Sequence, residues 1–275
     1  MSNYLTFYYD GKLRNESSLF LSDYVYKDNK MEYSFILNGY NEYVNSGTYL
    51  EYEIANNHGK FKNRIDLLNP KNRFVGVGIC TLTIIKNVRN EDKGERISYF
   101  MVHERNPLLT EHPGQKSVIP AGTFEPIVKS KLCTPENFNI ENTVFREFGE
   151  EVLGIDDFTS LVGVELLEEG IIGKIRSASK TKYLGAGFDI MNGKLEMMGL
   201  LIIDAAKIEK DCADFSIEEV LNYIKLSPNA EGDVFTRKLT KAYLNQYANS
   251  VLCTPVARQI FKIVVENFYN KDFLE

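Results

Sequence analysis

The chain has 275 residues, 44% of them hydrophobic and 25% charged, and its formal net charge is −6 at pH 7. This length and composition are typical of a globular protein, and no stretch approaches the roughly 20 consecutive apolar residues of a membrane-spanning helix. An acidic chain without a basic run is not suited to bind a nucleic-acid polymer. Because the N-terminus is unlike a signal peptide and no two cysteines are closely spaced, we expect a cytoplasmic protein without disulfide bonds or a zinc site.

The N-terminal segment, 1–73, differs from the rest because it is rich in Tyr and Asn and carries short alternating runs such as 48–52. Such runs favour short strands, so we expect a β-rich extension to a main domain over 74–275. That domain begins with an apolar, β-branched run, 74–85. A second run, 97–102, follows a polar turn, and together the two predict a hairpin.

Farther along the chain, the pattern alternates between helix and strand. An acidic helix is predicted from Glu141 to Leu153 and ended by Gly154, since glycine is favoured just past a helix. Strands are predicted at 161–166, 183–190 and 195–203, with a hairpin turn at Asn192-Gly193 between the last two. Ser216 and Thr254 are predicted N-caps of two later helices, and Pro255 stands at the first position of the last one. This order predicts an α/β (α+β) fold with a mixed sheet.

The acidic helix concentrates carboxylates. Glu147, Glu150 and Glu151 stand at spacings of i to i+3 and i to i+4, which makes them neighbours on an α-helix. Like charges placed in this way repel one another, so they are usually either solvated or bound to a hard cation. A solvated helix face therefore remains an alternative to a metal site.

Two segments resemble the Nudix box. The run from Arg146 to Ile155 is similar to its second half, R-E-U-x-E-E-x-G-U, with one additional residue before Gly154. The run Pro120-Ala121-Gly122-Thr123-Phe124-Glu125 is similar to its P-G-G-x-x-E loop, with alanine at one glycine position. An insertion, 127–140, separates loop from helix, and Phe138 stands where the family has a further glutamate.

The resemblance implies a Nudix-like α/β/α sandwich and a hydrolase that cleaves a pyrophosphate bond in a nucleoside diphosphate linked to another group. An NTP, a dNTP, a non-standard purine nucleotide and an ADP-ribose-like compound all remain open as substrates. The implied cofactor is Mg²⁺, with Mn²⁺ as the alternative, and the implied metal ligands are Glu147, Glu150 and Glu151. Arg146 would hold a box carboxylate in place, and the Ala121-Gly122 turn would let the backbone approach the metal or phosphate.

The water-activating group has two main candidates. Glu125 lies in the loop, and Glu196 resembles the late glutamate of the family; Glu136, inside the insertion, is a third. We interpret His103 and His112 as structural or exposed, because lone histidines usually are.

A catalytically inactive, nucleotide-sensing Nudix-like module is the alternative function, favoured by Phe138 and the insertion. By analogy with the family, the extension 1–73 and the segment 176–182 are predicted to read a small-molecule nucleotide, and the extension is a candidate homodimer interface.

Overall fold

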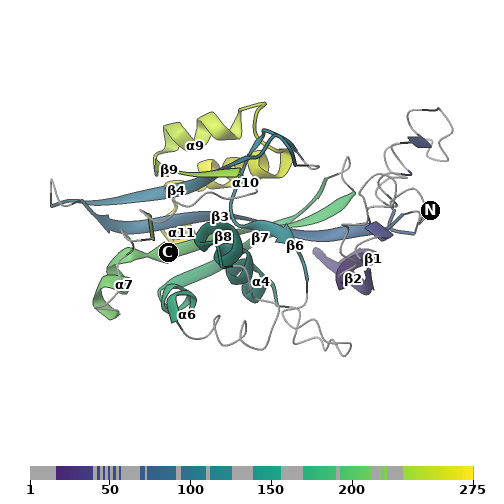
Figure 1. Cartoon of the computed structure of the whole chain (residues 1–275), viewed down its shortest axis with the longest axis horizontal. Coiled ribbons are helices and arrows are strands. Elements are labelled where there is room, and N and C mark those ends of the chain that lie inside the picture. Colours follow the sequence, from purple (N-terminus) through teal and green to yellow (C-terminus); the bar gives the residue numbers. More distant parts are fainter. Residues whose placement is uncertain are drawn as a thin grey trace.

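A mixed nine-stranded sheet runs through the part of the chain that the computed structural model describes (Figure 1). The described residues are 17–39, 69–71, 73–90, 94–109, 112–125, 139–155, 170–189, 193–211 and 232–274, together with isolated positions within 42–56 and 217–221. The strands are β1 (Ser17–Lys27), β2 (Lys30–Gly39), β3 (Val75–Arg89), β4 (Arg96–Arg105), β5 (Lys116–Ser117), β6 (Ala121–Thr123), β7 (Ser179–Asp189), β8 (Lys194–Asp204) and β9 (Gly232–Lys238).

Strand β3 is the centre of this sheet. It pairs antiparallel with β1, β4 and β6 and parallel with β8, from Gly76 opposite Lys194 to Lys86 opposite Asp204. Strand β9 pairs with β4, and β7 pairs with β8. The two predicted hairpins are confirmed as β3–β4 and β7–β8. A strand that is paired on both sides and covered on both faces reads as a continuous apolar run, which is how β3 appears in the sequence.

Helices cover both faces of the sheet. One face carries α4 (Ile140–Glu147), the π-helix η2 (Phe148–Val152), α6 (Gly170–Ser177) and α7 (Ala205–Asp211), and the other carries α9 (Lys241–Ala248), α10 (Pro255–Glu266) and α11 (Lys271–Leu274). Side chains of β3 alternate between the two cores, so that Ile79 packs in the first and Leu82 in the second. The predicted α/β/α arrangement with a mixed sheet is therefore confirmed.

The last long helix begins where the sequence predicts. The hydroxyl of Thr254 accepts a hydrogen bond from the backbone N–H of Ala257. Pro255 occupies the first turn, where a backbone N–H would have no partner within the helix, so proline loses no hydrogen bond there. Ile260, Phe261 and Val264 of this helix are buried against the sheet. No described helix is long and apolar enough to span a membrane.

The acidic segment is not one α-helix, so the prediction for Glu141–Leu153 is wrong in its second half. The α-helix ends at Glu147, and η2 continues with the wider π-helical turn. Gly154 then ends the helix at φ +63°, as predicted, and the N–H of Ile155 donates to the carbonyl of Gly149. The wider turn accommodates the residue that the run carries beyond the R-E-U-x-E-E-x-G-U pattern.

The N-terminal extension contains strands, but the predicted strand at 48–52 is wrong where it is described. Tyr49 and Tyr52 are helical, and so are Tyr43 and Glu53. Tyr43 and Glu53 are buried, whereas Tyr49 and Tyr52 are exposed. Tyr43 packs against Gly76 of β3, a long-range contact that the tyrosine content does not reveal.

The extension and the main domain share the sheet, because β1 pairs with β3 at Phe20 opposite Gly76 and Leu21 opposite Val75. The domain boundary at 73/74 stays a prediction. The predicted strand 161–166 and the predicted cap at Ser216 lie outside the described residues.

Removing one buried ring should measure how much the second core contributes. Phe100 is fully buried and meets Phe261 edge to face, with ring centroids 5.8 Å apart. We expect Phe100→Ala to lower the free energy of unfolding by about 3–5 kcal/mol, because it removes a ring and leaves a cavity. Leu108→Ala, at an exposed position, is the control and should change it by less than about 0.5 kcal/mol. Equal midpoints for the two variants in chemical denaturation would contradict this packing.

Candidate functional site

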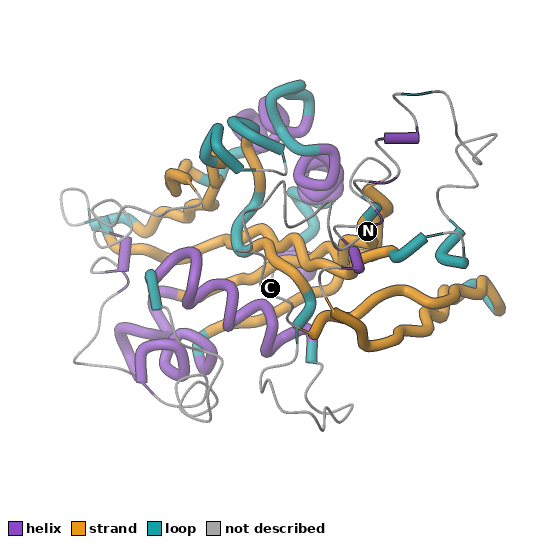
Figure 2. The backbone as a smooth tube through the Cα atoms, turned by 45° about the vertical axis from the view of Figure 1, so that its right-hand side comes forward, coloured by secondary structure: helices purple, strands orange, loops and turns teal. Residues whose placement is uncertain are grey.

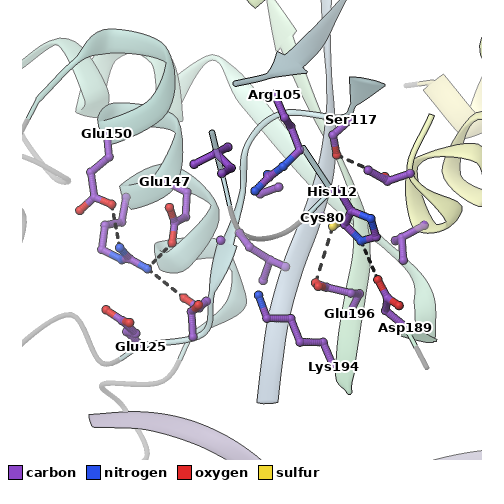
Figure 3. Close-up of a pocket in the computed structure, with 18 residues that line it drawn as sticks. Cys80, Arg105, His112, Ser117, Glu125, Glu147, Glu150, Asp189, Lys194 and Glu196 are labelled. Carbon is purple, nitrogen blue, oxygen red and sulfur yellow. Dashed lines mark hydrogen bonds and ion pairs between the residues drawn. The ribbon is translucent and has the colours of Figure 1, made fainter. Parts of the chain in front are cut away.

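A pocket of about 380 Å³ lies between the acidic helix and the sheet (Figure 3). It brings together residues from five separate parts of the sequence, within 79–80, 105–125, 146–150, 189–196 and 254–256. The predicted site residues that line it are Ala121, Gly122, Glu125, Arg146, Glu147, Glu150 and Glu196. Glu151 is the one predicted site residue that does not line the pocket. Phe138 and Glu136 lie outside the described residues.

Arg146 is the centre of the acidic side of this pocket. Its guanidinium donates to Glu150 Oε2 at 2.8 Å, to Glu147 Oε1 at 2.5 Å and to the carbonyl of Thr123 at 3.0 Å. Burial alone would lower the pKa of Arg146, but the charges of Glu147, Glu150 and Glu125 raise it above its usual value. Arg146 therefore carries a fixed positive charge that offsets its acidic neighbours.

Glu147 and Glu151 are buried, at 7% and 6% exposure, which differs from a solvated helix face. Glu147 lies so close to Gly122 that a Cβ added there would be 2.0 Å from Oε1. Glu151 turns to the same strand, where its Oε2 accepts a hydrogen bond of 2.8 Å from the N–H of Ala121. The loop and the helix of the resemblance are thus in direct contact through these two carboxylates.

Glu196 enters the pocket from the sheet. It lies within β8, as the predicted strand 195–203 implies, and is paired with Gly78 of β3. A Cβ at Gly78 would be 2.4 Å from Glu196 Oε2, so this glycine makes room for the carboxylate. The thiol of Cys80 donates to Glu196 Oε2 at 3.6 Å. Burial, and then the charge of Glu196, raise the pKa of Cys80 well above its ordinary value.

The other wall of the pocket consists of residues that the sequence does not point to. Arg105, His112, Asp189 and Lys194 all line it, and His112 Nε2 lies 2.8 Å from Asp189 Oδ2. His112 was interpreted as structural or exposed, whereas it faces the pocket. Asp189 and Lys194 flank the predicted Asn-Gly hairpin, so their proximity to each other could have been inferred. The position of Lys194 next to β3 could not.

The segment 176–182, predicted to read the nucleotide, does not line this pocket. It forms the end of α6 and the start of β7. The segment is therefore not a loop, because its residues from Ser179 onward pair with β8. Its predicted role in reading the nucleotide stays a prediction.

The donor chemistry of the acidic side fits a hard divalent cation, since carboxylate oxygens are the ligands that Mg²⁺ takes. As they are placed in the described part of the chain, however, these carboxylates do not form a metal site. Within the described residues, no group of three or more His, Cys, Asp or Glu side chains is placed so that it could hold a metal ion. Arg146 engages Glu147 and Glu150, and Ala121 engages Glu151. The metal ligands therefore stay a prediction.

No family model matches the sequence, and no curated protein matches it either. Among solved structures, the chain is similar to a mutT/nudix family protein from Listeria innocua, at 13% identity and a TM-score of 0.38, over 73% of this chain and 98% of that one. It is also similar to a Nudix hydrolase from Alicyclobacillus acidocaldarius, at 11% identity and a TM-score of 0.36, over 70% and 91%. At these TM-scores neither likeness carries an inference about this chain.

The contact between Gly122 and Glu147 can be tested with one methyl group. Gly122→Ala should push the Glu147 carboxylate away from Arg146 and lower the free energy of unfolding by about 1–3 kcal/mol, as overpacking does. Gly187→Ala is the matched control, because a Cβ there meets only ordinary contacts at 3.8 Å. Thermal and chemical denaturation of both variants provide the measurement. A Gly122→Ala protein as stable as Gly187→Ala would show that the carboxylate is not confined.

Proposed function

We propose that the chain is a Nudix-type hydrolase that cleaves a pyrophosphate bond in a nucleoside diphosphate linked to another group. One observation carries this proposal: residues of the two box segments and of β8 converge on one pocket. Gly122, Arg146 and Glu196 are far apart in the sequence, and a chance match to a motif gives no reason for them to meet.

The charge of the pocket supports a divalent cation as part of the proposal. Five carboxylates line the pocket, against three side chains that are cationic at neutral pH. A diphosphate is itself anionic, so additional positive charge next to the glutamates would strengthen its binding there. Mg²⁺, or Mn²⁺ in its place, would neutralise the phosphate charge and lower the pKa of bound water. Glu147, Glu150 and Glu151 are the residues that would hold it.

The residues of the chain have distinct roles in this proposal. Arg146 orients Glu147 and Glu150 through separate N–H groups, a geometry that suits a planar guanidinium. Gly122 lets the Glu147 carboxylate reach the loop. Glu125 and Glu196 are the candidates to orient or deprotonate the attacking water, and both line the pocket.

A second candidate is a nucleotide-binding module without catalysis. It is favoured by the absence, within the described residues, of a group arranged to hold a metal ion. In that case Arg146 would serve only to stabilise the buried carboxylates, and a nucleotide would bind without turning over.

A homodimer through the extension also belongs to the proposal. Strands β1 and β2 form a hairpin that extends from the edge of the sheet (Figure 2). Its exposed apolar side chains are Val25, Tyr26, Met31, Ile36 and Leu37. An apolar surface of this kind is often an interface.

The activity can be tested by incubating the purified protein with Mg²⁺ and a panel of NTPs, dNTPs, NAD, ADP-ribose and dinucleotide polyphosphates, followed by chromatography of the products. We expect Glu150→Gln and Glu151→Gln to lower kcat on the substrate found by more than the roughly 10–100-fold that loss of a residue supporting a metal ligand costs. Glu141→Gln changes a partly exposed glutamate that lies in the same acidic segment but outside the pocket, and it should keep the wild-type rate. Metal-dependent binding of a nucleotide without turnover would favour the second candidate, and full activity of both variants would rule out the metal ligands proposed.

Arg146→Lys tests the geometry of the cation separately from its charge. We expect kcat to fall about 10–100-fold, because an ammonium is a point charge that cannot hold two carboxylates in a planar fork. Arg96→Lys is the matched control, since Arg96 forms an exposed ion pair of 2.9 Å with Glu209. Steady-state kinetics of the two variants give the comparison. Wild-type turnover in Arg146→Lys would mean that charge alone is sufficient.

A further inference from the structure

The pocket has a cationic wall, formed by Arg105 at the end of β4 and Lys194 at the start of β8. Figure 3 shows both side chains between the glutamates Glu125, Glu147 and Glu150 on one side and the His112–Asp189 pair on the other. Sheet pairing determines these positions, because Lys194 stands opposite Gly76 in β3 and opposite Asp189 in β7. The two cations are therefore part of the rigid sheet and not of a loop.

Lys194 is unusually buried for a lysine, at 7% exposure. Its ammonium lies 5.5 Å from the centroid of the Tyr43 ring, a cation–π contact. The ring itself comes close because Gly76 has no side chain, and a Cβ there would be 3.1 Å from Tyr43. Burying an ammonium costs free energy, so such a residue is usually retained for a ligand or a structural partner.

A further buried cation lies behind the same wall. Arg73 is 8% exposed, and none of its three guanidinium nitrogens makes a hydrogen bond to the part of the chain that the structure describes. It packs against Gly193, in the turn that precedes Lys194, where a Cβ would lie 1.7 Å from Nη2. Arg73 does not line the pocket, so its effect there is through its electric field, which adds to that of Lys194.

The carboxylates near this wall already have donors. Asp189 is paired with His112, Glu196 accepts from Cys80, and Glu147 and Glu150 accept from Arg146. An anion entering the pocket would thus meet Arg105 and Lys194 beside carboxylates whose charge is partly offset. The pocket volume, about 380 Å³, is within the range of small-ligand sites.

We propose that Arg105 and Lys194 form an anion subsite that holds one phosphoryl group of the substrate directly, without a metal ion. An adjacent phosphoryl group of the proposed substrate would then lie toward the glutamate side, so the substrate class is a compound with at least two linked phosphoryl groups. This assignment deepens the proposed function and rests on it for the nature of the substrate. Direct binding of the anion by the two side chains does not depend on turnover.

The test is calorimetric titration of the full chain with inorganic pyrophosphate in EDTA, at physiological ionic strength. We expect one pyrophosphate per chain, and at least about tenfold weaker binding to Lys194→Met and to Arg105→Gln. Lys262→Met removes an exposed lysine of α10 and should bind as the wild type does. Glu150→Gln should bind in EDTA at least as tightly as the wild type, because it removes a negative charge from the pocket.

No binding to the wild type, or equal binding to both cation variants, would overturn the subsite. Because Lys194→Met removes a buried side chain, its thermal unfolding is compared with that of the wild type. If it does not fold, Arg105→Gln decides the question alone. If pyrophosphate binds through these residues but no nucleotide is hydrolysed, the anion subsite is supported and the proposed hydrolase activity is contradicted. If a nucleotide is hydrolysed but neither variant weakens pyrophosphate binding, the activity is supported and the anion subsite is contradicted.

Discussion

The pairing of β3 with its neighbours is the constraint on which the site depends. Gly78 of β3 stands opposite Thr123 in β6 on one side and opposite Glu196 in β8 on the other. Arg146 is fixed to the same point, because it donates to the carbonyl of Thr123. One residue of one strand therefore sets the positions of the loop, the helix and the late glutamate. A one-residue slip of β8 would turn Glu196 to the opposite face.

Charge balance explains how so many ionisable groups can share one small pocket. Buried carboxylates are tolerated only when they are paired and hydrogen-bonded, and Arg146 with the N–H of Ala121 supplies these bonds. The cations Arg105 and Lys194 are separate from that cluster and lie along the sheet. The pocket thus has an acidic side, where three glutamates surround one arginine, and an opposite side, where Arg105 and Lys194 balance Asp189 and Glu196. That asymmetry suits a ligand with several linked anionic groups.

Local signals in the sequence predict local structure well in this chain. The hairpin that ends before Lys194 and the start of α10 at Thr254-Pro255 are each signalled by a few neighbouring residues, and both are confirmed. The strand predicted at 48–52 is wrong at Tyr49 and Tyr52, which are helical. The nearby Tyr43 is buried next to Gly76 of β3, a contact between distant segments that a local pattern does not reveal. The acidic side of the site could be inferred from its motif. The cationic wall could not, since the parallel pairing of β3 with β8 joins segments more than a hundred residues apart.

The π-helix reconciles the irregular motif with the geometry of the site. An additional residue in a regular α-helix would rotate everything after it by about 100°. The wider turn of η2 takes up this residue, so Phe148, Val152 and Leu153 all stay buried and Gly154 still ends the helix. Such single-turn π-helices are found frequently at functional sites. Here the turn lets Arg146 reach both Glu147 and Glu150 while Glu151 faces the loop at Ala121. The additional residue is therefore compatible with the acidic cluster, and the wider turn distributes its carboxylates between two partners.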